Sequence, residues 1–437
     1  MDYRIRPARR FRGRWQAAGD KSITHRALLF GALAEGDTEL ANANRGLDCA
    51  RTRALVEALG VAVADLGPGK LRLTGRGGRF RAPEGPLEAG GSATTMRLAA
   101  GLLAAQPFET ILDGDASLRR RPMARVADIL AALGARVEAA DGGTPPMRVR
   151  GGALRGGAAT SPVASGQLKT AFLLAALQAE GESRFSEPGP SRDHGERLLA
   201  RMGADIARDG EALVLTGPQA LRGAALTIPG DLSAAAFLLA AAVLVEGGSV
   251  VARGVGVNPT RDGFLRVLER MGGRLAVFHP REAAGEPVAD LLAQHSPLRA
   301  VEVGPEEVPS LIDELPLLGL LAARAAGTSR FHGLGELRVK ESDRLAGTAD
   351  LIAAFGGRAR VEDDGLVVEG GCPLRGAEID PRGDHRLAMA AAVMGMAVRG
   401  ETVVRGAECV ADSFPEFPAL ARRFSGGALT QAAAEGA

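Results

Sequence analysis

The sequence predicts an α/β protein built of two similar domains. Its length of 437 residues is too great for one ordinary hydrophobic core and favours two or three domains. An apolar content of 46% with 24% charged residues is typical of a globular chain. A unit made of an apolar helix, strands and a second helix recurs six times along the sequence, at spacings of roughly 65–80 residues.

The first helix of each unit is apolar on every side and is therefore predicted to be buried. Each copy opens with a small or polar cluster and runs into an Ala/Leu-rich stretch. Gly and Ala in these stretches would let the helices approach one another closely. The six copies span 19–36, 90–105, 164–181, 230–248, 312–327 and 383–400.

Strand-like pieces and a one-sided helix follow the buried helices. Examples are the strand "TILDGD", the helix "MARVADILAALG" and the later strand "MRVRG". A helix with one apolar face packs that face against the protein interior. The one-sided helices and the sheets are therefore predicted to surround the buried helices. We therefore expect a two-domain inside-out α/β barrel with three βαβαββ-type units per domain. The expected domains are 19–229 and 1–18 plus 230–424, and 425–437 is expected to be a flexible tail.

Composition argues against several classes of protein. A net charge of +1 disfavours nucleic acid or a membrane surface as the main partner. The longest apolar run, 232–245, is too short to span a bilayer. Cys49, Cys372 and Cys409 are odd in number and far apart, which indicates neither a disulfide framework nor a zinc site. A reducing, cytoplasmic location is expected.

Lysine is rare in this chain. Of 53 basic residues only Lys21, Lys70, Lys169 and Lys340 are lysines. A sequence that uses Arg almost everywhere is expected to keep Lys where a compact ammonium does what a guanidinium does not. Chance retention on the surface is the alternative for any one of them.

The starts of the buried helices carry polar and charged residues. Helix N-termini present unpaired N–H groups and a positive dipole end, which suit anions. Six such ends facing one cleft would form a phosphate or carboxylate site. Ser, Thr and Asp are also ordinary N-caps. Capping does not explain Lys21, Gln167, Lys169 or Arg386 at the same places.

Three further clusters combine charge with an apolar neighbour. "DGDASLRRRPM" places three arginines, 119–121, before a helix, where they form either a solvated loop or a clamp for an oxyanion. "IDEL" places Asp313 against an apolar helix, which disfavours its charged form and suits proton transfer, or makes it a simple N-cap. "LRVKESDRL", residues 337–345, is either a solvated turn or a ligand contact.

Eight stretches, in order and at matching spacing over nearly the whole chain, resemble the signatures of the 5-enolpyruvylshikimate-3-phosphate synthase family. They are "GDKSITHRALL", "ASGQLKTAFLLAAL", "SRDHGERLL", "NPTRDGF", "IDELPLL", "LRVKESDRLA", "GDHRLAMA" and "SFPEF". The resemblance implies the inside-out barrel and transfer of the enolpyruvyl group of phosphoenolpyruvate to the 5-hydroxyl of shikimate-3-phosphate, with release of phosphate. It places the chain in the shikimate pathway of aromatic amino acid biosynthesis. No metal or cofactor is called for, and a monomer is expected.

The resemblance also implies roles for individual residues. The catalytic set is Asp313, Glu341 and Lys21. The shikimate-3-phosphate set is Lys21, Ser22, Arg26, Ser165, Gly166, Gln167, Arg192, Asp313 and Lys340. The phosphoenolpyruvate set is Lys21, Ala93, Arg121, Gln167, Arg344 and Arg386.

The chain departs from the family pattern at several positions. Ala18 stands where a Pro is usual, Gly166 where Ala is usual, and Gly91 and Ala93 where Asn and Gly are common. Asp412 stands where some members carry a substrate-facing Lys. The extra methyl of Ala93 is expected to crowd glyphosate, the longer inhibitor that overlaps the phosphoenolpyruvate site, and so to reduce sensitivity to it.

Two other functions fit parts of the sequence. The enolpyruvyl transferase that acts on UDP-N-acetylglucosamine shares the architecture, but normally carries a cysteine in a loop that has none here, 113–123. A non-enzymatic ring of six repeats, such as a DNA clamp, would also explain the repetition. Near-neutral charge and clusters of mixed sign disfavour the ring.

Overall fold

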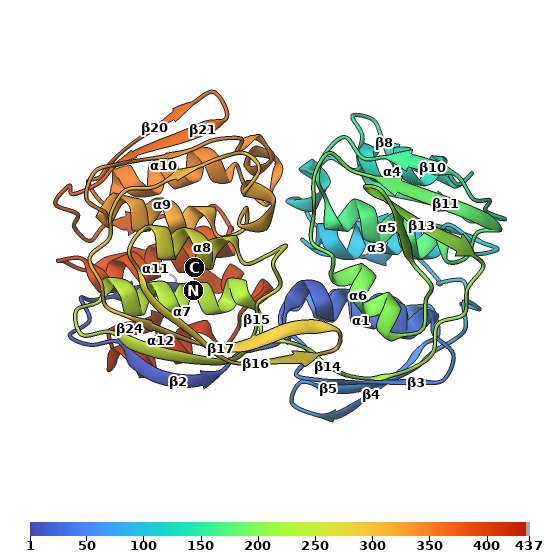
Figure 1. Cartoon of the computed structure of the whole chain (residues 1–437), viewed down its shortest axis with the longest axis horizontal. Coiled ribbons are helices and arrows are strands. Elements are labelled where there is room, and N and C mark those ends of the chain that lie inside the picture. The colour runs from blue at the N-terminus through green and yellow to red at the C-terminus, as the bar shows by residue number, and fades with distance from the viewer. Residues whose placement is uncertain (434–437) are drawn as a thin grey trace. The chain divides into compact units, whose positions relative to one another are not determined.

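The structure is a computed structural model of the chain and describes residues 1–433. It divides into two compact units. Unit 1 consists of Met1–Ala18, Gly230–Arg281 and the chain from Pro287 onward. Unit 2 consists of Gly19–Pro229 together with the short segment Glu282–Glu286. Figure 1 labels the helices and strands of both units.

Three apolar helices form the interior of unit 2: α1 (Lys21–Leu33), α3 (Ala93–Leu103) and α5 (Gly166–Ala176). Helix α3 packs against both of the others. Close packing requires Gly101 in α3, because a Cβ there would lie 2.1 Å from the carbonyl oxygen of Ala171 in α5. Each helix follows a residue whose side chain accepts a hydrogen bond from its first turn, namely Asp20, Ser92 and Ser165.

One-sided helices and short strands enclose these three helices. The helices are α2 (Leu47–Ala58), α4 (Ala124–Ala131), α6 (His194–Arg201) and the 3₁₀ turn η1 (Leu118–Arg120). The strands are β3 (Asp37–Ala41), β4 (Ala62–Gly67), β5 (Lys70–Thr74), β6 (Leu87–Glu88), β7 (Glu109–Asp113), β8 (Arg136–Ala140), β9 (Thr144–Arg150), β10 (Ala158–Thr160), β11 (Gly181–Ser186), β12 (Ala207–Asp209), β13 (Ala212–Gly217) and β14 (Ala225–Thr227). They form three four-stranded sheets in the orders β14-β3-β5-β4, β6-β7-β9-β8 and β10-β11-β13-β12.

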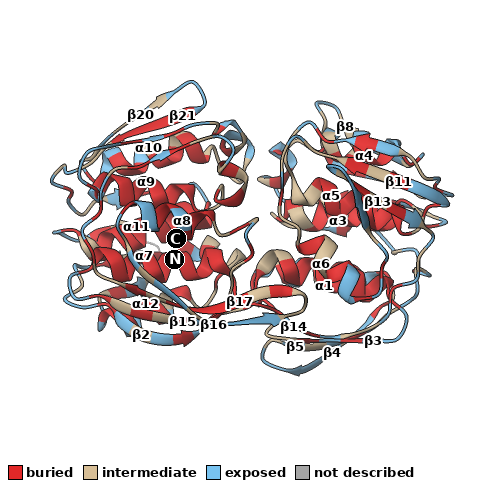
Figure 2. Cartoon of the chain, viewed as in Figure 1, coloured by how far each residue is buried: buried red, intermediate tan, exposed pale blue. Residues whose placement is uncertain are grey.

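Unit 1 repeats this design around α7 (Leu232–Leu244), α9 (Leu315–Arg324) and α11 (His385–Ala397). Every residue of α7 is buried, and Figure 2 shows the three helices in red along most of their length. They contact one another pairwise. The outer helices are α8 (Gly263–Arg270), α10 (Arg344–Ala354) and α12 (Phe417–Ser425), with 3₁₀ turns η2 (Val308–Ser310), η3 (Gly335–Val339) and η4 (Ala407–Asp412).

The strands of unit 1 also form three four-stranded sheets. They are β1 (Asp2–Ile5), β2 (Arg12–Gln16), β15 (Ser249–Gly256), β16 (Arg274–Ala283), β17 (Glu286–Gln294), β18 (Glu302–Val303), β19 (Thr328–Phe331), β20 (Arg358–Glu362), β21 (Gly365–Glu369), β22 (Glu378–Ile379), β23 (Thr402–Val404) and β24 (Leu429–Ala432). The orders are β22-β23-β1-β24, β16-β17-β15-β2 and β18-β19-β21-β20. The predicted arrangement of buried helices and outer sheets is confirmed.

Pairing between strands links distant repeats within each unit. In unit 2, β14 runs parallel to β3, and β3 pairs antiparallel with β5. Since β14 follows the third repeat and β3 belongs to the first, this sheet closes the unit on itself. In unit 1, β2 runs parallel to β15 in the same way.

The end of the chain differs from the flexible tail expected for 425–437. Residues 429–432 form β24, which pairs antiparallel with β1 from Asp2 to Ile5. Leu429 is 1% exposed, so this strand contributes to the core of unit 1. The Ala/Gly-rich composition of this segment did not indicate a strand. Its pairing partner β1 lies at the opposite end of the sequence, so no local pattern revealed the pairing. Residues 434–437 lie outside the described part.

None of the helices within residues 1–433 combines the length and the apolar character needed to cross a bilayer.

Candidate active site

In unit 2 most of the predicted site residues lie at or near the starts of the three buried helices, whereas Arg121 and Arg192 lie outside these helices. Lys21 is the first residue of α1, directly after the cap Asp20, whose Oδ1 accepts from the backbone N of Ile23 at 2.8 Å. The Lys21 ammonium lies 2.8 Å from Oδ2 of Asp48 near the start of α2, and the two side chains are 13% and 15% exposed. Asp48 therefore fixes the position of this ammonium, a contact that no local motif indicated.

Arg26 joins α1 to α5. Its guanidinium donates to the Ser22 carbonyl (2.9 Å), to the Gly166 carbonyl (2.7 Å) and to Oγ1 of Thr170 (2.9 Å). Arg26 is only 2% exposed, so most of its donors are already used inside the protein. The structure thus brings Ser22, Arg26 and Gly166 together, with Arg26 setting the distance between two helix starts.

Gln167 links the start of α5 to the start of α3. Its Nε2 donates to Oγ1 of Thr94 at 2.9 Å, and its Oε1 accepts from Nη1 of Arg97 at 2.7 Å. Arg97 also donates to the Pro122 carbonyl at 2.9 Å, directly after Arg121. Arg97 was not among the predicted site residues, although it lies one turn into α3. Its charge in an otherwise apolar helix was the available signal.

The three consecutive arginines have different environments. Arg119 pairs with Asp113 at the surface, with Nη2 to Oδ2 at 2.5 Å, and Arg120 donates to the Ala116 carbonyl at 2.8 Å. Arg121 is only 6% exposed and ends the turn η1. The solvated-loop interpretation therefore fits the first two, and Arg121 alone is held inside.

Gly91 has little space for a side chain. A Cβ at this position would lie 3.1 Å from Oδ2 of Asp115 and 3.4 Å from Oγ of Ser117. Ala93, the first residue of α3, is 2% exposed, so its methyl group is packed inside the protein. A side chain at position 91 would require a small shift of the Asp115 carboxylate.

Lys169 positions the segment that carries Arg192. Its ammonium lies 3.0 Å from Oε1 of Glu187 and 2.7 Å from Oε1 of Glu196, and it donates to the Ser191 carbonyl at 3.2 Å. The side chain is 3% exposed. Lys169 is thus a buried structural lysine next to Arg192, whereas Lys70 lies exposed on β5.

His25, in the first signature, is buried behind the charged helix start. Its Nδ1 lies 2.6 Å from Oγ1 of Thr52, which in turn lies 2.7 Å from Oγ1 of Thr95. Burial, together with the charges of Lys21 and Arg26, holds the pKa of His25 well below its ordinary value of 6.5. The imidazole is therefore neutral and serves as a hydrogen-bonding partner.

In unit 1, Asp313 lies between two arginines. Its Oδ1 is 3.4 Å from Nη1 of Arg344, and its Oδ2 is 3.7 Å from Nη2 of Arg386. Arg386 also donates to the Asp313 backbone carbonyl at 3.1 Å. The N-cap position of α9 is occupied by Glu314, not Asp313. The capping interpretation of Asp313 is therefore wrong, and its carboxylate faces charged groups.

Arg344 is the centre of this cluster. It is the first residue of α10, is 1% exposed, and contacts Oδ2 of Asp384 at 2.8 Å and Oε2 of Glu341 at 2.6 Å. Burial lowers the pKa of the Arg344 guanidinium, but the charges of Asp384, Glu341 and Asp313 outweigh burial and raise it above its ordinary value. Arg344 is therefore permanently charged.

Asp384 was not among the predicted site residues. It is fully buried and caps α11, where its Oδ1 accepts from the backbone N of Arg386 at 2.9 Å. Burial raises the pKa of its carboxyl, but the Arg344 charge prevails and holds that pKa below its ordinary value. Its position directly before His385 and Arg386, at the start of a buried helix, could have indicated a charged residue that holds its neighbours in place.

The stretch 337–345 is only partly a solvated turn. Arg338 and Val339 are exposed, whereas Lys340 and Glu341 are partly buried and Arg344 is buried. Lys340 follows the turn η3, and Glu341 reaches Arg344. The charged residues of this stretch therefore divide between the surface and the cluster around Arg344.

One group of potential metal ligands occurs within residues 1–433. Asp193, His194 and Glu286, all in unit 2, bring ligand atoms within 4.8 Å of one another. Nδ1 of His194 lies 2.8 Å from Oε1 of Glu286, and Asp193 accepts from Nε of Arg197 at 2.8 Å. These contacts account for the group as a buried hydrogen-bonded cluster, and it supports no metal assignment.

Comparison with known proteins gives one consistent result. A family model described as EPSP synthase (3-phosphoshikimate 1-carboxyvinyltransferase) matches residues 5–420. The chain is 46% identical over 435 residues to the 3-phosphoshikimate 1-carboxyvinyltransferase of Acidiphilium cryptum, with 98% of this chain and 97% of that protein covered. The chain belongs to the EPSP synthase family.

Further relatives agree with membership of the EPSP synthase family. The 3-phosphoshikimate 1-carboxyvinyltransferase of Acidithiobacillus ferrooxidans is 44% identical over 422 residues, with 96% of this chain and 97% of that protein covered. A solved EPSP synthase from Acinetobacter baumannii has a TM-score of 0.86 at 39% identity, covering 98% of this chain and 100% of that one. These matches do not favour the UDP-N-acetylglucosamine transferase or a ring of repeats.

A more distant solved structure shows the same fold. The enolpyruvyl transferase NikO from Streptomyces tendae has a TM-score of 0.81 at 21% identity, with 98% of both chains covered. At this identity the likeness concerns the fold alone. The EPSP synthase assignment therefore depends on the nearer relatives.

Proposed function

We propose that this chain transfers the enolpyruvyl group of phosphoenolpyruvate to the 5-hydroxyl of shikimate-3-phosphate, with release of phosphate, in the shikimate pathway. The observation that carries the proposal is the match to named 3-phosphoshikimate 1-carboxyvinyltransferases over nearly the whole of both chains. The charged clusters at the helix starts supply groups that suit two anionic substrates.

The proposed roles of the unit 2 residues follow from their match to the family signatures. Lys21, Ser22, Arg26, Ser165, Gly166, Gln167 and Arg192 would contact shikimate-3-phosphate. Lys21, Ala93, Arg121 and Gln167 would contact phosphoenolpyruvate. The carboxylate of Asp48 near Lys21 supports a fixed ammonium, and the contacts of Arg26 indicate that it acts mainly by positioning α5.

The unit 1 residues would supply the proton transfers and part of the anion binding. Asp313 and Glu341 are the proposed proton-transfer pair, Lys340 and Asp313 would contact shikimate-3-phosphate, and Arg344 and Arg386 would contact phosphoenolpyruvate. Both carboxylates contact the Arg344 guanidinium, at 3.4 Å and 2.6 Å. Binding of an anion at this arginine would therefore change the environment of both carboxylates at once.

The reaction needs these types of group. Carbon C3 of phosphoenolpyruvate gains a proton while the 5-hydroxyl loses its proton and attacks C2. The tetrahedral intermediate then loses phosphate as C3 loses a proton. A positioned acid or base contributes ~10²–10⁴-fold to each transfer. Fixed positive charges stabilise the phosphate and carboxylate groups throughout, and the carbon–oxygen exchange requires no redox step.

The proposal also includes the domains, oligomeric state, location and partners of the enzyme. Units 1 and 2 would be the two folding domains, and the protein would act as a cytoplasmic monomer with small-molecule substrates and without nucleic acid or membrane partners. Near-neutral net charge supports the absence of a nucleic-acid partner.

A phosphate-release assay tests the proposal. Both substrates are supplied, and then each is omitted in turn, with UDP-N-acetylglucosamine as a second acceptor. We expect phosphate only when phosphoenolpyruvate and shikimate-3-phosphate are both present, and almost none from a folded Lys21→Ala variant. Release with UDP-N-acetylglucosamine in place of shikimate-3-phosphate would overturn the assignment of the acceptor.

A further inference from the structure

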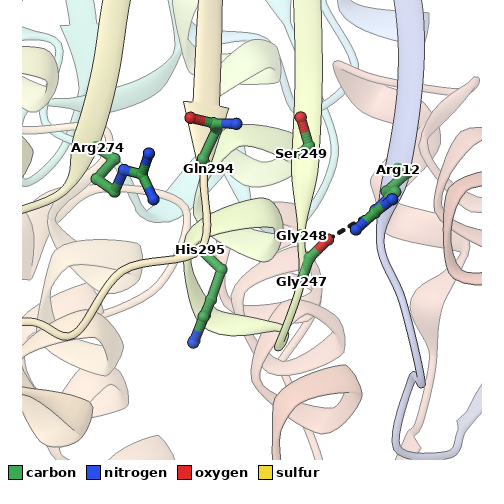
Figure 3. Close-up of a pocket in the computed structure, with 7 residues that line it drawn as sticks. All are labelled: Arg12, Gly247, Gly248, Ser249, Arg274, Gln294 and His295. Carbon is green, nitrogen blue, oxygen red and sulfur yellow. Dashed lines mark hydrogen bonds between the residues drawn. The ribbon is translucent and has the colours of Figure 1, made fainter.

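The sheet β16-β17-β15-β2 of unit 1 carries a pocket that the proposed reaction does not use. Its volume is about 370 Å³. It is lined by Arg12, Gly247, Gly248, Ser249, Arg274, Gln294 and His295 (Figure 3). The pocket lies just beyond the C-terminal end of α7, whereas the start of α7 bonds to the charged cluster through Ser233 and Glu314. A helix of this length spans about 20 Å, so the pocket is separate from that cluster.

The polar side chains of the pocket form one row across the sheet. Ser249 pairs directly with Arg12 on one side and with Gln294 on the other. Arg274 begins β16, which adjoins the end of β17. Side chains alternate along a strand, and the next residue, Val250, is fully buried, so Ser249 points outward. Two guanidiniums therefore flank a hydroxyl and an amide on the outer face of the sheet.

The two arginines of the row have no acidic partner within residues 1–433. Arg12 donates Nε to the Gly247 carbonyl at 2.8 Å, which leaves its terminal nitrogens available. The Arg274 side chain makes no hydrogen bond or ion pair with the described residues. Two unneutralised charges beside a concave surface are typical of an anion site.

Within residues 1–433, several arginines on the other outer sheets are paired with acids, unlike Arg12 and Arg274. Arg72 pairs with Glu39 at 2.7 Å, Arg150 with Glu109 at 2.9 Å and Arg184 with Asp209 at 2.6 Å. The strand after the buried helix begins with Asp37 in β3 and with Glu109 in β7. At the corresponding place β15 begins with Ser249. Here the row carries a hydroxyl where β3 and β7 carry an acid.

The carbonyl groups at the end of α7 are already engaged. Nδ1 of His295 donates to the Val243 carbonyl at 2.8 Å, and the backbone N of Ser296 lies 3.3 Å from the same oxygen. These contacts, together with the bond from Arg12 to the Gly247 carbonyl, reduce the partial negative charge that the end of α7 exposes. An anion bound at the row would therefore contact hydrogen-bond donors and not these carbonyl oxygens.

We propose that this pocket binds a small anion bearing a phosphate group. The guanidiniums at the two ends of the row, with a hydroxyl and an amide between them, are donors that suit phosphate oxygens. The volume leaves room for a small organic substituent, so the source would be either inorganic phosphate or a phosphate monoester. Binding here does not depend on the proposed reaction.

Arginine modification with a dicarbonyl reagent tests the proposal residue by residue. The native protein is treated in chloride at matched ionic strength, in inorganic phosphate or in glycerol 3-phosphate. The rate at each arginine is read from peptides by mass spectrometry. At a ligand concentration of twice the dissociation constant, Arg12 and Arg274 should react about threefold more slowly. Arg14 is the control, because it lies exposed on the same face of β2 and has no ion pair with any residue of the described chain, 1–433.

The variant Arg274→Gln provides a second measurement. It should abolish the protection of Arg12, whereas Arg14→Gln should leave that protection unchanged. Protection by phosphate indicates that the free ion suffices, and protection by glycerol 3-phosphate alone indicates a monoester. Equal rates at Arg12 and Arg274 in all three solutions would overturn the proposal, and so would equal protection of Arg14.

Discussion

Nε of Arg344 donates to Oδ2 of Asp384 at 2.8 Å, and neither side chain exposes more than 1% of its surface. The contact joins the start of α10 to the cap of α11. Through it, the arginine that also contacts Asp313 and Glu341 is fixed in place. The charged cluster of unit 1 thus depends on a carboxylate that has no proposed contact with substrate.

Asp384→Asn should destabilise the protein by about 3 kcal/mol, because it deprives a buried guanidinium of a fully buried acidic partner. Urea unfolding measures the loss. Asp350→Asn is the matched control, since Asp350 pairs with Arg382 at 2.8 Å on the surface and should cost less than about 1 kcal/mol. Equal losses in the two variants would contradict the role given to Asp384.

Stability should fall as pH falls below the ordinary histidine value of 6.5, because of His25. The pKa of folded His25 lies well below that value, so between the two values only the unfolded chain binds the proton. Proton binding then stabilises the unfolded state, so this residue lowers the free energy of unfolding by up to about 1.4 kcal/mol for each pH unit. In His25→Gln this part of the slope should disappear, and in the exposed His332→Gln it should remain. An unchanged slope in His25→Gln would refute the assignment.

Lys169→Met should destabilise the protein by about 3 kcal/mol, because it removes a buried ammonium that pairs with the largely buried carboxylates of Glu187 and Glu196. It should also raise the KM for shikimate-3-phosphate, since Lys169 holds the segment before Arg192. Lys70→Met is the control and should change stability by less than about 0.5 kcal/mol. A normal KM in a folded Lys169→Met protein would show that the segment does not need this lysine.

Ala93→Gly should make the enzyme more sensitive to glyphosate. Removing the buried methyl group at the start of α3 relieves crowding of the longer inhibitor more than crowding of the substrate. Inhibition assays at fixed phosphoenolpyruvate should show a lower inhibition constant, by roughly tenfold, which corresponds to ~1.4 kcal/mol. If sensitivity does not increase while the KM for phosphoenolpyruvate is unchanged, the proposal that this methyl group crowds glyphosate is contradicted.

The sequence contained most of the information about the fold. Fully apolar helices of similar length, repeated six times, can be read locally because burial on all sides leaves a strong compositional signal. Pairing between distant segments leaves no such signal. The strand at Leu429–Ala432 escaped prediction because it is completed only by β1, at the other end of the chain.

The contacts within the candidate site could not be predicted from the sequence. The signatures singled out Lys21, Gln167, Asp313 and Arg344. Their partners Asp48, Arg97 and Asp384 come from other segments and were found only in the structure. Such partners form no fixed spacing with the residues that they hold, so sequence patterns do not identify them.

The most direct test is the mass of the product formed in deuterium oxide. Protonation of C3 of phosphoenolpyruvate by a solvent-exchanged acid, followed by loss of one of three methyl hydrogens, should leave deuterium in the vinyl group of the product. We predict labelled 5-enolpyruvylshikimate-3-phosphate from the native enzyme, formed at least about tenfold more slowly by Asp313→Ala. Unlabelled product, or no product from the two substrates, would contradict the proposed transfer.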